Sequence, residues 1–333
     1  MVKACLLLPA AVALAAAQST LLDLAMPDAK ALFGINVERL RASRLAQGLW
    51  SQLPAQEPDL AGLIQATGFD PLRQLSEILI ASPGGARQRN ALLLVRGAFT
   101  GMDLLSLAKS RGAHSETFQG VEIVTSGKEQ PMAVALLEQT LLIAGDPASV
   151  RGAIARRGRP GQVSAELRRK AAELSAQYDL WGVSTLPPAE LAAQAPEADA
   201  MGLFRGGAMK AIEEVSGGMR LRGDLQLMVN TVSRSEQDAA NLANALRFFL
   251  SMAQSRQPAG QPFLQDLKRS GRSLTISASI PEAEVEKIIA AMRSGRRAGA
   301  ASTPAAPAES GVTIYSSPSD MGVVKIPAPK PPQ

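Results

Sequence analysis

Two short stretches hold residues whose types and spacing could support enzyme chemistry. Ser106 and Lys109 have the Ser-x-x-Lys spacing of penicillin-recognising serine enzymes, in which the serine hydroxyl is the nucleophile. The companion Ser-Asp-Asn and Lys-Thr-Gly elements are missing from the sequence, so we interpret Ser106 as a polar position on an amphipathic helix. His114 is the single histidine, and it lies in a predicted turn with no paired nucleophile nearby. We therefore predict no catalytic residue and no enzyme activity; an enzyme of unrecognised type ranks last among the functions considered.

The sequence is poor in ligands for metal ions and cofactors. One histidine and one cysteine, Cys5, leave almost no ligands for a zinc, copper or haem site. Acidic residues are not crowded at alternate positions, as a calcium loop requires. The glycines Gly202, Gly206 and Gly207 do not follow a dinucleotide-binding or phosphate-binding spacing. We predict no metal ion and no cofactor.

Basic residues concentrate between positions 151 and 170, where Glu166 is the single acidic residue. Such a run could bind an anionic lipid head group, a glycan or an acidic partner, whereas the simpler interpretation is a solvated linker. Aromatic residues make up 4% of the chain, too few for base stacking, so we predict no nucleic-acid partner despite the net charge of +5. The candidate anionic-ligand patch comprises Arg151, Arg156, Arg157, Arg159, Arg168, Arg169 and Lys170.

The first residues have the features of an export signal. Lys3 supplies a positive charge, residues 6–16 form an apolar run that is short for a membrane span, and Ala15 and Ala17 suit a signal peptidase. We predict cleavage after Ala17 and a periplasmic or secreted bacterial protein; a retained N-terminal anchor helix is the alternative. Cys5 precedes most of the apolar run and is badly placed for lipoprotein acylation, so the mature chain would have no thiol.

A short motif near the start of the chain returns about 148 residues later. Residues 32–40 read LFGINVERL and residues 180–188 read LWGVSTLPP, so in both an aromatic residue precedes a glycine and a β-branched residue follows. We therefore predict an α+β fold of two tandem copies of one unit, each a strand and helix, an antiparallel meander and a second helix. The predicted segments are a signal peptide at 1–17, a first unit at 18–160, a second unit at 161–295 and a disordered Pro/Ala-rich tail at 296–333.

Hydrophobic periodicity places the elements of these units. Asp-Pro pairs predict helix starts at Asp70 and Asp146, with the aspartate as N-cap, and Ser235 is the predicted N-cap of a long helix. The main predicted strands are 31–37, 78–82, 90–99, 118–126, 132–137, 140–145, 180–184, 219–223, 225–233 and 273–280, and the main predicted helices are 38–53, 59–66, 101–111, 148–156, 165–176, 188–194, 208–215, 235–255 and 281–292.

Three motifs in the first half of the chain resemble exported bacterial proteins of unknown function. They are a Leu-Phe-x-x-Asn strand at 32–36, a Gly-Phe-Asp turn at 68–70 and a strand ending in Arg-Gly-x-Phe at 96–99. The resemblance implies fold and export, and it carries no activity or site residue. We predict a non-enzymatic envelope protein with a binding or scaffold role, whose partner is an envelope protein, an anionic lipid or a polymer. The alternative is a periplasmic carrier of a hydrophobic or anionic lipid.

Overall fold

The computed structural model describes residues 21–50, 64–65, 68–84, 91–101, 104–110, 112–127, 131–188, 190, 210–254, 264–287 and 290. The chain divides into two compact units, Met1–Lys287 and Ile288–Gln333, and the description below concerns the first. The predicted signal peptide and tail lie outside the described residues, as do most of the helices predicted at 59–66 and 188–194.

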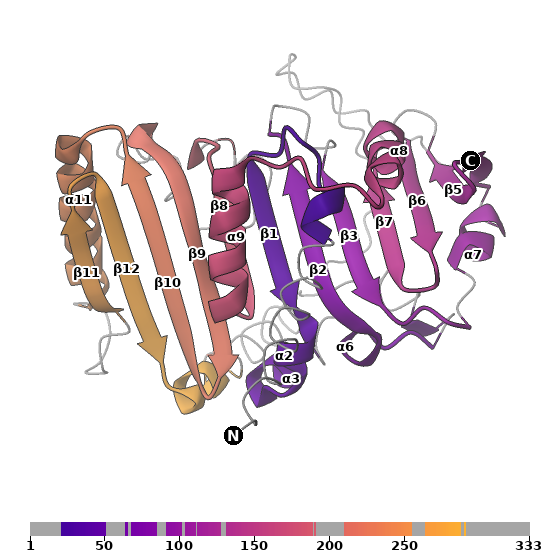
Figure 1. Ribbon diagram of the computed structural model, residues 1–333. Coiled ribbons are helices and arrows are strands. Elements are labelled where there is room, and N and C mark those ends of the chain that lie inside the picture. The colour runs from indigo at the N-terminus through magenta and orange to yellow at the C-terminus, as the bar shows by residue number, and fades with distance from the viewer. Residues whose placement is uncertain are drawn as a thin grey trace, which may run out of the picture. The chain divides into compact units, whose positions relative to one another are not determined.

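The first unit is built on one twelve-stranded sheet, in the order β11-β12-β10-β9-β8-β1-β2-β3-β7-β6-β5-β4. Every pair of neighbouring strands is antiparallel, and Figure 1 shows β8 directly beside β1. The predicted two-copy architecture is therefore wrong, because the two matching segments are neighbours in one continuous sheet. The strands are β1 (Ala31–Asn36), β2 (Leu75–Ser82), β3 (Leu92–Gly97), β4 (His114–Phe118), β5 (Val121–Ser126), β6 (Met132–Leu137), β7 (Leu141–Gly145), β8 (Leu180–Ser184), β9 (Ile212–Arg222), β10 (Asp224–Ser233), β11 (Leu264–Ser270) and β12 (Ser273–Ile280).

The motif that suggested a duplication has a packing explanation instead. In the β1–β8 register, Gly34 lies opposite Trp181 and Phe33 lies opposite Gly182. Each strand thus places a glycine across from the other strand's aromatic residue, and large rings on adjacent strands are accommodated in this way. Packing requires the glycine only at position 34, where the Trp181 ring fills the space of a Cβ atom; a Cβ atom at Gly182 would meet the Phe33 ring at an ordinary contact distance.

Short polar side chains begin several helices. Asp146 accepts hydrogen bonds from two backbone N–H groups of the following turn, and Asp70 accepts one, so both Asp-Pro predictions are confirmed. Ser235 Oγ accepts the backbone N–H of Asp238, as predicted for the long helix. The helices are α2 (Val37–Arg41), α3 (Arg44–Trp50), α6 (Pro71–Gln74), α7 (Leu104–Ser110), α8 (Pro147–Arg156), α9 (Ala165–Gln177) and α11 (Glu236–Gln254).

Three element predictions are wrong in detail. The helix predicted at 38–53 is interrupted between α2 and α3. The helix predicted at 208–215 overlaps the start of β9, where hydrogen bonds to β8 and β10 override a helix-favouring composition. The single strand predicted at 118–126 belongs to a hairpin of β4 and β5, whose turn places Gln119 and Gly120 at φ values of 50° and 76°.

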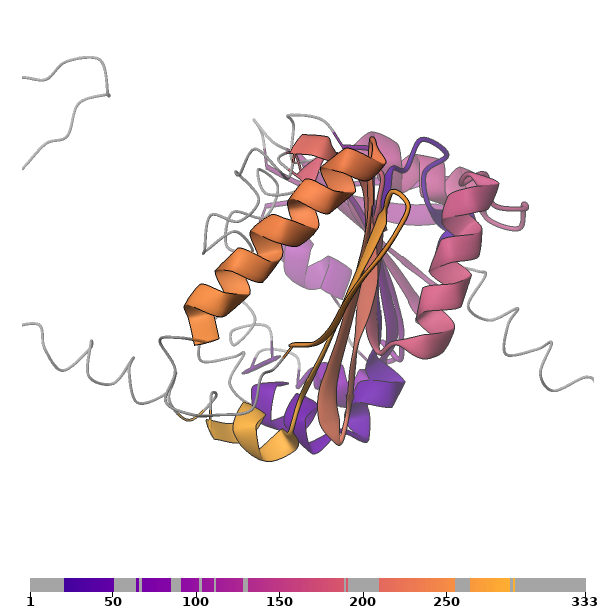
Figure 2. The same cartoon turned by 90° about the vertical axis from the view of Figure 1, so that its left-hand side faces the viewer.

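Helices cover opposite faces of the sheet, and Figure 2 shows α9 and α11 on its two sides. The α9 face carries α8, α9 and residues 21–29, whose side chains join the largest buried cluster. On the α11 face, α11 packs against β10, β11 and β12, and apolar side chains of α2 and α6 join residues of β2 and β3. Among the described residues, no helix has both the length and the apolar character needed to cross a membrane.

Candidate functional site

The seven basic residues of the predicted anionic-ligand patch are largely engaged within the protein. Hydrogen bonding to Glu116 raises the pKa of Arg151. Burial lowers the pKa of Lys170, but the hydrogen bonds and the charges of Glu214 and Glu166 together raise it above its ordinary value. Arg157 and Arg159 are exposed and form no ion pair within the described part of the chain. The ion pairs join Arg151 to Glu116 and Arg169 to Glu173 at the surface, and Lys170 to both Glu166 and Glu214 at a half-buried position.

Two further members of the patch hold the first described segment of the chain. Arg156 donates hydrogen bonds of 2.8 and 3.2 Å to the carbonyl oxygen of Leu24, and burial lowers the pKa of Arg156. Arg168 pairs with Asp23 at 2.8 Å, and the same carboxylate accepts the backbone N–H of Gly161. These two arginines therefore fix the N-terminal segment onto α8 and α9. Arg151, Arg157, Arg159 and Arg169 are the exposed members of the patch, and Arg157 and Arg159 are the two without an ion pair among the described residues.

The residues first considered for catalysis lie at the surface. Ser106 and Lys109 are exposed on α7, and the Lys109 ammonium is 3.0 Å from the carboxylate of Glu122. His114 is exposed and begins β4, opposite Thr125, whereas the sequence placed it in a turn. Within the described ranges, no three His, Cys, Asp or Glu side chains come together as a metal site would need.

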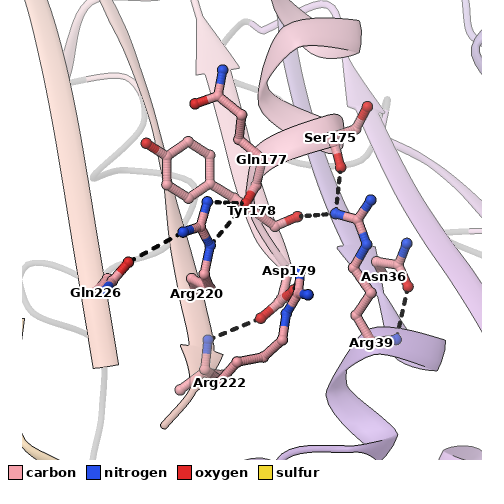
Figure 3. A network of polar contacts seen from close by, with 10 residues as sticks. Asn36, Arg39, Ser175, Gln177, Tyr178, Asp179, Arg220, Arg222 and Gln226 are labelled. Atoms are coloured by element: carbon pink, nitrogen blue, oxygen red, sulfur yellow. Dashed lines mark hydrogen bonds and ion pairs between the residues drawn. The ribbon is translucent and has the colours of Figure 1, made fainter. Parts of the chain in front are cut away.

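A polar network that the sequence did not reveal lies at one end of the central strands (Figure 3). Arg39 of α2 donates to the carbonyl oxygens of Ser175 and Tyr178, at 2.8 and 3.3 Å. Arg220 of β9 donates to the carbonyl oxygen of Gln177 and lies 5.8 Å from the centre of the Tyr178 ring. Both guanidinium groups meet the last turn of α9, whose carbonyl groups carry partial negative charge. The network ties α2, α9 and β9 together across the β1–β8 pair.

Two carboxylates lie in the same row across the sheet, on either side of Asn36. Asp179 is fully buried, and it accepts the backbone N–H of Leu221 at 2.9 Å and a hydrogen bond from Arg222 at 3.3 Å. The Asn36 N–H donates to the Asp179 carbonyl oxygen, and Glu77 is the partner of Asn36 in the β1–β2 register.

Glu77 has a different environment from Asp179. Burial raises its pKa to about 7, Arg96 opposes this shift from 4.0 Å, and the charge of Glu38 adds to it. A carboxylate with such a pKa exchanges its proton near neutral pH. It is the most perturbed acidic group of the described residues.

The α11 face carries a continuous apolar surface over six strands. Alternation places apolar residues at matching register positions of β2, β1, β8, β9, β10 and β12 on this face. Eleven of the twelve are half-buried, and Phe33 is exposed at 39%. We call this set the apolar surface: Phe33, Ile35, Ile78, Ile80, Leu180, Met219, Leu225, Leu227, Val229, Ile276, Ala278 and Ile280.

The middle of the apolar surface has a position without a side chain. Gly182 lies between Phe33 of β1 and Gly217 of β9 in the register of the sheet. A Cβ atom added at Gly182 would meet the Phe33 ring at 3.5 Å, an ordinary contact distance. Packing therefore does not require glycine here, and a Cβ atom would make ordinary contacts.

Comparison with known proteins supports the fold and little more. No protein-family profile and no curated protein matches the sequence. One solved structure, crystal form III of TP0453, is similar with a TM-score of 0.53 and 10% sequence identity, over 78% of this chain and 93% of that chain. The likeness concerns the arrangement of elements, so the resemblance to exported proteins of unknown function remains a prediction.

Proposed function

We propose that this chain is an exported, non-enzymatic protein of the bacterial envelope and that it binds its ligand or partner through the apolar surface. The observation that supports binding is the set of half-buried apolar side chains on six adjacent strands, with Phe33 exposed near its centre. Exposed apolar side chains that gather on one face of a folded protein commonly mark an interaction site. The export signal predicted at residues 1–17 supports the location.

An acyl-chain lipid is the second candidate, as the cargo of a periplasmic carrier. Gly182 favours it, because a methylene chain could lie against the strand backbone beside the Phe33 ring. A protein partner would instead insert its own apolar side chains at the same place. The hydrophobic effect would drive the binding of either a lipid or a protein partner. The two candidates differ in whether the purified protein retains a small molecule.

Native mass spectrometry separates the two candidates. The mature chain, residues 18–333, is purified gently from the envelope fraction of its host and weighed intact. A reproducible extra mass in the lipid range supports the carrier. The bare mass of the chain excludes a retained lipid and leaves the protein partner as the candidate.

A binding titration tests the apolar surface itself. The affinity of a dansyl-labelled fatty acid, a fluorescent probe, is measured for the wild type and two variants. Gly182→Leu adds an apolar side chain at the empty position, and we expect it to weaken probe binding about tenfold because a few methylene groups of burial are lost. Ser277→Leu is the matched control, since Ser277 lies on β12 one position from Ile276 and so faces the opposite side of the sheet. Equal probe affinity for the wild type and both variants would contradict the assignment of the apolar surface as a lipid site.

A further inference from the structure

Two exposed arginines lie in the turn that follows α8. The guanidinium groups of Arg157 and Arg159 form no ion pair and no hydrogen bond within the described part of the chain. Between Asp146 and Glu166 the chain contains four arginines and no acidic residue. The turn therefore carries positive charge that its own segment does not neutralise.

The backbone of this turn has a defined shape. The Arg159 N–H donates to the carbonyl oxygen of Arg156 at 3.0 Å, with φ −55° and ψ 133° at Arg157 and φ 71° at Gly158. These angles fit a type II β-turn, in which glycine supplies the positive φ of the third position. Arg157 and Arg159 thus occupy the second and fourth positions of one turn.

Contacts on both sides hold the turn in place. Arg156, its first residue, donates to the carbonyl oxygen of Leu24, and the N–H of Gly161 donates to the Asp23 carboxylate at 2.9 Å. A Cβ atom at Gly161 would overlap Asp23 and Arg168, so the chain packs closely at this point. The two exposed arginines are therefore presented by a fixed loop, and little backbone has to become ordered when they bind.

The acidic residues beside the turn do not neutralise it. Residues 21–30 and 147–177, which form this layer, contain eight basic and four acidic residues. Three of the four acids are in ion pairs: Asp23 with Arg168, Glu166 with Lys170 and Glu173 with Arg169. The fourth, Asp28, is exposed and its charge acts on Arg156, and Lys30 carries the opposite charge two residues further on. The layer is positive, and its unpaired cations are at the turn.

We propose that Arg157 and Arg159 dock the protein onto the phosphate head groups of an anionic bilayer. A guanidinium group binds phosphate oxygens through two parallel hydrogen bonds and keeps its charge at any physiological pH. Recognition of a single small anion needs donors that converge on one point, whereas a bilayer presents many phosphates side by side. Two arginines on one exposed turn match the second arrangement.

The turn and the apolar surface belong to opposite faces of the sheet. The turn joins α8 to the layer of α9, and the apolar surface lies on the side of α11 (Figure 2). Docking through the turn would leave the apolar surface uncovered, so that the protein could bind a membrane and its ligand at the same time. The docking itself does not rest on the proposed function.

Co-sedimentation of the mature chain, residues 18–333, with vesicles tests the docking. One set of vesicles contains phosphatidylglycerol and phosphatidylcholine in equal amounts, and the other contains phosphatidylcholine alone. We expect the wild type to bind the anionic vesicles and not the neutral ones. Each basic residue near an anionic surface contributes about fivefold to binding, so the double variant Arg157→Ala/Arg159→Ala should bind about 25-fold more weakly.

Arg44→Ala/Arg269→Ala is the matched control, because it removes the same charge from two exposed arginines that form no ion pair within the described ranges. Arg44 is on α3 and Arg269 is on β11, and Figure 1 shows both elements far from α8. Since distant charges are screened by salt, the control should bind within about twofold of the wild type. An equal loss in both double variants would mean that net charge alone acts, and it would overturn the docking site.

Arg157→Lys/Arg159→Lys separates a bilayer from a single bound phosphate. It keeps both charges and loses the forked geometry, so bilayer binding should stay within about threefold of the wild type. A loss as large as that of the alanine variant would show recognition of one anion and would overturn the bilayer assignment. Equal binding of the wild type to both sets of vesicles, or to neither, would also overturn it. The assay contains no fatty-acid probe, so failure of the apolar surface to bind a lipid leaves these outcomes unchanged.

Discussion

The indole ring of Trp181 lies across Gly34 of the neighbouring strand, in the space that a Cβ atom at position 34 would occupy. Trp181 is 5% exposed and belongs to the main buried cluster, so its ring cannot move aside into solvent. The β1–β8 pair, which joins the two halves of the sheet, depends on this contact. Glycine at 34 is thus required by packing, although its φ is not in the left-handed region.

Gly34→Ala should lower the free energy of unfolding by about 1–3 kcal/mol, because the added methyl group forces a packed ring or strand to shift. Urea unfolding followed by tryptophan fluorescence measures the loss. Gly182→Ala is the matched control on the partner strand, where the new Cβ has an ordinary contact, and it should change stability by less than about 1 kcal/mol. Equal losses in the two variants would show that chain flexibility, and not the Trp181 ring, explains the glycine.

The N-terminal segment gives a second prediction. Leu21 is fully buried in the main cluster, so Leu21→Ala should cost about 2–5 kcal/mol of unfolding free energy. Asp23→Ala should cost about 1–3 kcal/mol, because it leaves Arg168 and a backbone N–H without their acceptor. Arg169→Ala, which breaks an exposed pair, should cost under about 0.5 kcal/mol. Thermal unfolding of the mature chain gives the ranking, and a large effect of Arg169→Ala would contradict it.

Local patterns predicted single elements well and their assembly poorly. The alternation in β10 and β12 and the caps at Asp146 and Ser235 are written in adjacent residues, and the structure confirms them. The pairing of β1 with β8 joins residues about 150 positions apart, and the similarity of the two segments favoured a repeat over a contact. Sequence similarity cannot distinguish two copies of a unit from two strands that pack against each other.

The candidate sites show the same limit. The basic run at 151–170 was visible in the sequence. Its ion pairs with Asp23 and Glu214 could not be predicted, because these two partners are distant in the chain. Glu77 had no sequence signal, because its raised pKa depends on burial in the folded protein. The apolar surface was visible strand by strand, and the sheet register was needed to join the strands into one surface.

A third prediction concerns the network at the end of α9. Arg39→Ala removes two hydrogen bonds from a guanidinium group to carbonyl oxygens, and it should cost about 1.5–3 kcal/mol of unfolding free energy. Arg39→Lys keeps the charge near the helix end but loses the forked geometry, so an intermediate loss is expected. Urea unfolding of both variants provides the measurement. Arg157→Ala, at an exposed arginine without an ion pair among the described residues, should stay within about 0.5 kcal/mol of the wild type. A neutral Arg39→Ala would mean that the network does not hold α2.

The pH dependence of stability gives the last prediction, and its sign follows from Glu77. The pKa of this group is about 7 in the folded protein against 4.5 for an unperturbed glutamate, so the folded chain binds the proton more tightly than the unfolded chain. The contribution of Glu77 to stability is complete below pH 4.5 and is lost as the pH rises through 7. One pKa unit is worth about 1.4 kcal/mol, so the loss is on the order of 3 kcal/mol at most.

Glu77→Gln does not titrate, and the difference in unfolding free energy between the variant and the wild type isolates the contribution of this group. We expect the variant to gain on the wild type between pH 4.5 and 7, and the difference to stay constant above pH 8. Glu213→Gln, at an exposed carboxylate, should follow the wild type throughout. A difference that is flat across the whole range would mean that Glu77 is already ionised at pH 5 in the folded protein and that its burial does not raise its pKa.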